Sequence, residues 1–215
     1  MVRFSLFGIP VNIQPFFWLT MAFLSGNFSV DSTQGLINMM LFIIAGTFSI
    51  LVHEFGHALT IRAYGLPTTV TLEAFGGFAS YPAGVLNRKQ SFLVTAAGPA
   101  SQLLLALLIY LLLMNLPQQS MNANGLYFLE RLIFISVLWA LLNLLPIMPL
   151  DGGQLLNAIL GPQRIKITLW VTIITAVVMG IIAYKLFNLG AIFLLIFFAY
   201  FAFQAYKELQ ENKWR

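Results

Sequence analysis

Apolar stretches long enough to cross a lipid bilayer recur along the whole of this 215-residue chain. A bilayer core about 30 Å thick needs roughly 20 predominantly apolar residues in a helix. Only 8% of the residues are charged, whereas a soluble domain carries about a quarter. This composition excludes a soluble enzyme and a disordered chain. We predict a single all-α polytopic membrane domain over residues 1–215, with six transmembrane helices near 15–31, 36–63, 91–114, 127–146, 167–187 and 189–206.

The basic residues fall mainly on one predicted side of the membrane. With six spans both termini share a face, and that face holds all of the 11 lysines and arginines except Arg131 and Lys185. Because cytoplasmic loops are enriched in Lys and Arg, we expect a multi-pass cell-membrane protein with both termini and its active-site opening in the cytoplasm. Charges that flank apolar runs indicate contact with membrane lipid rather than with nucleic acid.

Two segments outside the long apolar spans favour short, membrane-associated β-hairpins. Residues 1–14 contain a Gly8-Ile9-Pro10 turn and are expected to lie at the membrane interface. Residues 68–81, between the second and third spans, read as two short strands broken at Gly76-Gly77. The second hairpin either lies in the cytoplasm or enters the bilayer. At membrane depth, unpaired backbone N–H and C=O groups are tolerated only where they face protein or a water-filled cavity.

The sequence His53-Glu54-Phe55-Gly56-His57 lies near the end of the second span and contains the only two histidines of the chain. Positions i and i+4 share one helix face, so both imidazoles can bind a single ion with Glu54 beside them. Ionisable groups inside a membrane span are costly and are functional by default. The alternative is a hydrogen-bonded His–Glu cluster that joins helices.

A hydrolytic zinc site needs a third protein ligand and an open position for water. The chain has no Cys and no third His, so the ligand must be a carboxylate. Asp151 is the better candidate because it follows two prolines at the end of the fourth span, on the same predicted side as His57. Glu73, in the β-rich segment, is the runner-up. Asp151 has the alternative role of an N-cap on a short following helix.

Two motifs together resemble the site-2 protease family of intramembrane zinc metalloproteases. They are His53-Glu54-x-x-His57 and Asn143-x-x-Pro146-x-x-Pro149-x-Asp151-Gly152-Gly153. The Ala97-Gly98-Pro99 sequence, the Gly76-Gly77 hairpin and the Phe7-Gly8-Ile9-Pro10 start are also similar, so the likeness covers residues 1 to about 160. One departure is Gln102, where many members carry Asn. Without a PDZ-like insertion or a nucleotide-sensing domain, the chain resembles a minimal member.

The resemblance implies an endopeptidase that cleaves transmembrane protein substrates, in regulated intramembrane proteolysis or in signal-peptide clearance. It implies that Zn²⁺ is held by His53, His57 and Asp151, with Glu54 as the general base. By the same resemblance Asn143 donates to the oxyanion, although an interhelical hydrogen bond explains that amide equally well. A strand edge near Gly76 and Gly77 would bind the unwound substrate by β-addition.

Two other functions compete with proteolysis. A metal transporter needs polar groups staged across the bilayer, whereas those of this chain cluster at one predicted depth. A catalytically silent homologue that binds transmembrane helices needs no general base, so Glu54 argues against it. A di-iron oxygenase needs many more histidines than two and is excluded. The sequence carries no signal for a particular oligomeric state.

Overall fold

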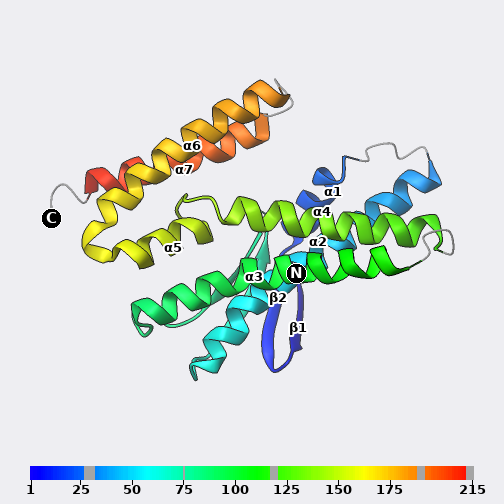
Figure 1. Cartoon of the computed structure of the whole chain (residues 1–215), viewed down its shortest axis with the longest axis horizontal. Helices are drawn as coiled ribbons and strands as arrows, with labels where there is room; N and C mark the ends of the chain where they lie inside the picture. Colours follow the sequence, from blue (N-terminus) through cyan, green and yellow to red (C-terminus); the bar gives the residue numbers. More distant parts are fainter. Residues whose placement is uncertain (27–31, 75, 117–120, 188–191, 212–215) are drawn as a thin grey trace. The chain divides into compact units, whose positions relative to one another are not determined.

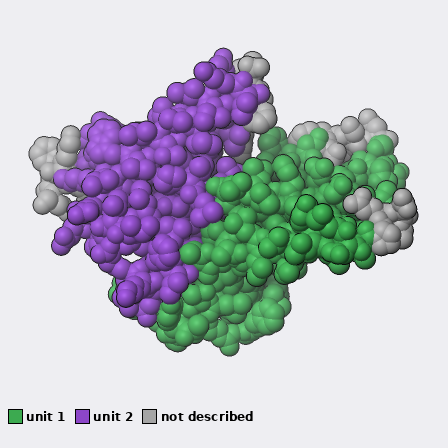
Figure 2. Space-filling view, in the orientation of Figure 1, with its two compact units in different colours: residues 1–85, 96–141 green, residues 86–95, 142–215 purple. Residues whose placement is uncertain are grey.

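The computed structural model describes residues 1–26, 32–74, 76–116, 121–187 and 192–211 (Figure 1). It divides into two compact units, which Figure 2 shows in different colours. Unit 1 consists of residues 1–85 and 96–141, and unit 2 consists of residues 86–95 and 142–215. The two units are described in turn below.

Four helical segments among the described residues are long and apolar enough to cross a membrane. They are α2 (Thr33–Ala63), α3 (Arg88–Asn115), α4 (Ala123–Asn143) and the segment Pro162–Leu186, which contains most of α6 (Ile165–Phe187). At 1.5 Å per residue the 31 residues of α2 span about 46 Å, more than a bilayer core. Helix α2 therefore tilts or extends beyond the hydrocarbon, as predicted for the second span. The four segments correspond to the second to fifth predicted spans.

The predicted count of six spans is not confirmed. Helix α1 (Pro15–Leu24) has ten residues and rises about 15 Å, half of a bilayer core. Residues 27–31 of the predicted first span lie outside the described residues. Helix α7 (Ile192–Glu211) overlaps the predicted sixth span, but it is not among the described segments that are long and apolar enough to cross a membrane. Its last turns carry Lys207, Glu208 and Glu211, and residues 189–191 lie outside the described part of the chain.

The two predicted hairpins combine into one four-stranded sheet, so the fold is mainly helical rather than all-α. The strands are β1 (Val2–Leu6), β2 (Ile9–Ile13), β3 (Thr69–Glu73) and β4 (Gly76–Ser80), in the order β1-β2-β3-β4. The outer pairs are antiparallel, whereas β2 and β3 run parallel, with Val11 opposite Val70 and Ile13 opposite Leu72. Gly76 and Gly77 begin β4, so the predicted break between the strands at this pair is wrong.

The core of unit 1 joins the sheet to the part of α2 that carries the histidine motif. Alternate side chains of a strand point to one face, and the buried residues of β2 and β3 follow this rule. They pack with α1 and with Ile50, Phe55 and Ala58 of α2. The members of this cluster from the sheet and from α1 are Ile9, Val11, Ile13, Val70, Leu72, Phe17 and Met21. The sheet therefore lies against the turns of α2 on either side of His53.

Unit 2 is built around α6 and α7, which lie side by side (Figure 1). The short helix α5 (Asp151–Leu160) precedes them and is followed by the 3₁₀ turn η2 (Pro162–Arg164). Ile147, in the loop before α5, is fully buried against Ala176 of α6 and Phe198 of α7. The helix pair thereby anchors the loop that leads to Asp151.

Candidate metal centre

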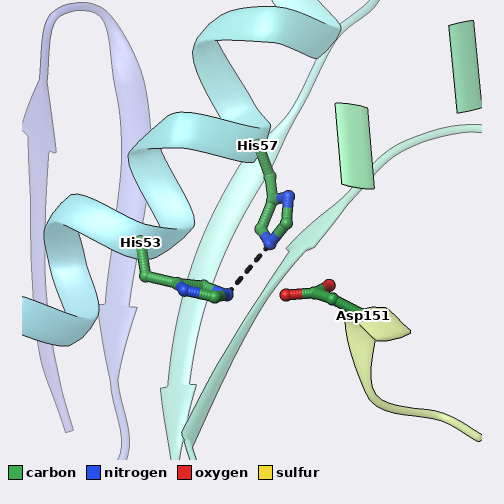
Figure 3. Close-up of side chains that lie close together, drawn as sticks. All are labelled: His53, His57 and Asp151. Carbon is green, nitrogen blue, oxygen red and sulfur yellow. Dashed lines mark hydrogen bonds between the residues drawn. The ribbon is translucent and has the colours of Figure 1, made fainter. Parts of the chain in front are cut away.

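The two histidines of the motif face one another on successive turns of α2. Their Nε2 atoms are 3.1 Å apart and their rings stand at 78° to each other (Figure 3). The exposed fraction is 2% for His53 and 9% for His57. Zinc–nitrogen bonds of about 2.0–2.1 Å in tetrahedral geometry place two ligand nitrogens about 3.3 Å apart. The observed spacing is close to that value, so the imidazole pair fits a shared ion.

A glycine on α3 makes room for His57. A Cβ atom on Gly98 would lie 2.2 Å from His57 Nε2 and 2.3 Å from its Cε1. Gly56 allows α2 and α3 to approach one another closely, because a Cβ atom there would lie 2.4 Å from the carbonyl oxygen of Ala97. Close backbone approach of this kind requires glycine. The sequence indicated Gly98 only through the family resemblance of Ala97-Gly98-Pro99.

Glu54 is buried between α2 and the edge strand β4, with 3% of its surface exposed. A Cβ atom on Gly77 would lie 2.6 Å from Glu54 Cγ and 2.8 Å from Oε1. The backbone of β4 therefore passes directly over the Glu54 side chain. Gly76, the other predicted substrate-binding glycine, is buried with its φ angle at 132°.

Asp151 is the first residue of α5 and is 7% exposed. The N-cap position is occupied by Leu150, so the alternative role of Asp151 as the N-cap is wrong. Pro146 and Pro149 follow the end of α4 at Asn143, as expected where proline cannot continue a helix. A hydrogen bond of 3.0 Å from the Met148 amide to Thr172 Oγ1 fixes this loop to α6.

The glycine pair after Asp151 is required by the same loop. A Cβ atom on Gly152 would lie 2.1 Å from the carbonyl oxygen of Leu144, and one on Gly153 would lie 2.5 Å from the carbonyl carbon of Ile147. The loop therefore folds back onto the first turn of α5 at a distance that only glycine permits. Asn143, the predicted oxyanion donor, is the last residue of α4 and is half-buried.

Within the described part of the chain, His53, His57 and Asp151 form a group that could hold a metal ion. One ligand atom from each side chain lies within 4.8 Å of the other two (Figure 3). Two imidazole nitrogens and one carboxylate oxygen are a donor set typical of catalytic zinc, which keeps a fourth position for water. Glu73, the runner-up ligand, ends β3 as an exposed residue outside this group.

Comparison with known proteins agrees with the candidate metal-binding group, because the matches are to a peptidase family and to zinc metalloproteases. The model of the family "Peptidase family M50" matches residues 41–123 and 114–184. The protein sll0528 of Synechocystis is 32% identical over 168 residues, which are 72% of this chain and 42% of that protein. "Zinc metalloprotease MJ0392" of Methanocaldococcus jannaschii is 26% identical, over 74% of this chain and 45% of that protein. The chain thus spans less than half the length of these relatives.

A solved structure has the same fold. The structure titled "Site-2 Protease from Methanocaldococcus jannaschii" superimposes with a TM-score of 0.68 and 24% sequence identity. The match covers 97% of this chain and 94% of the other. The arrangement of the small sheet and the apolar helices is therefore a fold that a solved structure also has.

Proposed function

Because the chain belongs to peptidase family M50, we propose that it is a zinc metalloendopeptidase that cleaves transmembrane segments of membrane proteins. The observation that carries this proposal is the buried donor set of His53, His57 and Asp151, with Glu54 next to the first histidine. The reaction would serve regulated intramembrane proteolysis or the clearance of signal peptides. A soluble metalloprotease is excluded, because four apolar segments of membrane-spanning length belong to this chain.

The two imidazoles and the Asp151 carboxylate would hold the zinc ion. Zinc bound by such a donor set lowers the pKa of water and polarises the scissile carbonyl group. Glu54 would accept a proton from the attacking water and deliver it to the leaving amine. Its position supports this role, since the buried carboxylate lies beneath β4, next to the histidine that precedes it in the chain.

The edge strand β4 would bind the substrate. Among the described residues β4 pairs with β3 and is the last strand in the order of the sheet, so β-addition would take place on its other side. A substrate helix must unwind before cleavage, and its freed backbone groups need new partners in lipid. A strand added next to Gly76 and Gly77 would lie beside Glu54, where the peptide bond is to be cut.

Proline substitutions on β4 test this substrate-binding strand. Successive N–H groups of a strand point to opposite sides, so only one of Phe78 and Ala79 directs its N–H away from β3. We expect one of Phe78→Pro and Ala79→Pro to lose most cleavage activity while zinc content and thermal stability are retained, and the other to destabilise the sheet. Phe78→Ala is the side-chain control. If a stable proline variant at each position cleaves normally, β-addition is wrong.

We propose a multi-pass arrangement in the cell membrane with both termini and the opening of the active site in the cytoplasm. The basic residues at the end of α2, at the start of α3, in η2 and at the start of α6 support this orientation. They are Arg62, Arg88, Arg164 and Lys166. The chain has no cysteine, so single-cysteine variants can report it. A cysteine at Arg164 should resist a membrane-impermeant maleimide in intact cells, whereas one at Lys185 should react. The reverse pattern contradicts the orientation.

Zinc removal tests the proposed activity. Purified protein should contain about one zinc per chain and cleave a model membrane-spanning substrate. Chelation should abolish cleavage, and added zinc should restore it. Retained helix binding without cleavage would indicate a catalytically silent homologue instead. Zinc flux into vesicles without cleavage would indicate a transporter.

A further inference from the structure

A series of buried, hydrogen-bonded polar side chains extends from His53 through unit 1. His53 Nδ1 lies 2.9 Å from Gln102 Oε1, and Gln102 Nε2 lies 2.8 Å from Ser49 Oγ. Ser49 Oγ in turn lies 2.8 Å from Ser136 Oγ. The four side chains come from α2, α3 and α4, and none is more than 2% exposed. Buried polar groups are costly unless they are hydrogen-bonded, and each of these four side chains has a hydrogen-bond partner in this series.

The backbone of α2 determines which way the Gln102 amide group is turned, and so which atoms donate in its hydrogen bonds. The carbonyl oxygen of Ser49 lies 3.4 Å from Gln102 Nε2, and a carbonyl oxygen can only accept. The amide nitrogen of Gln102 therefore faces Ser49, and its amide oxygen faces His53. Because that oxygen also only accepts, His53 Nδ1 carries a proton and donates it. The Ser49 hydroxyl accepts from Gln102, and either serine can donate in its hydrogen bond to Ser136.

We infer that Gln102 is a positioning residue that holds His53 in the tautomer with its proton on Nδ1. The Nε2 atom of this tautomer presents a lone pair toward His57 Nε2, 3.1 Å away, which is the form that binds a metal. The opposite tautomer carries its proton on Nε2 and cannot bind through that atom. The inference deepens the proposed zinc site and rests on that function. Ser49 acts through Gln102 by setting the direction of its amide.

The tautomer can be measured without zinc. The chain contains only two histidines, so the ¹⁵N NMR spectrum of histidine-labelled, zinc-free protein in micelles reports two imidazole rings, assigned with a His57→Asn variant. We expect His53 to be protonated on Nδ1 in the native chain and to lose this preference in Gln102→Met. A native His53 with its proton mainly on Nε2 overturns the inference, whatever the activity of the protein.

Zinc affinity provides the second readout. Loss of a group that orients a metal-bound histidine typically weakens binding 10- to 100-fold, and we expect a loss in this range for Gln102→Met. Gln102→Glu keeps an acceptor for Nδ1 and should bind zinc more tightly than Gln102→Met. Ser136 is the last side chain of the hydrogen-bonded series, farthest from His53, so Ser136→Ala should leave the His53 tautomer unchanged.

The outcomes separate this inference from the proposed function. A native chain that binds no zinc contradicts the proposed function, while its zinc-free spectrum still decides the tautomer. A native chain that binds zinc no more tightly than Gln102→Met contradicts the inference alone. If Gln102→Met fails to fold, the native spectrum and the Gln102→Glu variant decide the question.

Discussion

Glu54→Gln is expected to abolish cleavage while about one zinc per chain stays bound. The amide has nearly the same shape as the carboxylate, so the contact with Gly77 in β4 is preserved. It cannot accept a proton from water, and loss of a general base typically lowers the rate 10²- to 10⁴-fold. Metal analysis of the purified variant, together with cleavage of a membrane-spanning substrate in vesicles, measures both effects.

Glu73→Gln is the matched control for that substitution. Glu73 is an exposed carboxylate at the end of β3, outside the group of metal-binding candidates, so its substitution should change neither zinc content nor cleavage. Asn143→Ala provides a second comparison. An oxyanion donor typically contributes 10²- to 10³-fold to the rate, whereas an interhelical hydrogen bond would appear as lower thermal stability. Normal cleavage by Glu54→Gln with zinc bound would contradict the assigned role of Glu54.

Gly98→Ala is expected to empty the metal site without changing any ligand. The added methyl group would lie 2.2 Å from His57 Nε2, far inside contact distance. The α3 backbone cannot move easily, so the His57 side chain must rotate away and the site loses one of its three proposed ligands. We expect zinc affinity to fall by more than about 100-fold, beyond the effect of losing an orienting group. Equilibrium zinc binding to the purified variant measures this loss.

Gly180→Ala is the control for Gly98→Ala. It makes the same change in the middle of an apolar helix, α6, where the nearest atom to the new Cβ would be 3.8 Å away. An alanine generally favours helix over glycine by up to about 1 kcal/mol, so this variant should be at least as stable as the native chain and bind zinc normally. If Gly98→Ala retains native zinc affinity, the close contact with His57 has no functional consequence.

Properties that are local in the sequence were predictable from it. The length and composition of the apolar runs predicted six spans, and four of these correspond to described segments that are long and apolar enough to cross a membrane. These features depend only on the residues within each run. The i, i+4 spacing of His53 and His57 predicted the facing imidazoles, since the helical repeat alone sets that geometry. The two prolines before Asp151 predicted the end of α4, because proline lacks a backbone N–H and cannot continue a helix. The family resemblance is confirmed by the M50 match.

Contacts between distant segments were decided only by the tertiary structure. No pattern in residues 9–13 or 69–73 indicates that β2 and β3 pair in parallel, because either strand could pair with any other through the same backbone groups. The first helix is shorter than its apolar run suggested, and Leu150 rather than Asp151 occupies the N-cap. The contacts of Gly98 with His57, Gly77 with Glu54 and Gln102 with His53 depend on how closely segments approach, which packing sets. The sequence thus identified the candidate residues of the site, whereas packing within unit 1 decided which side chains and glycines surround His53, Glu54 and His57.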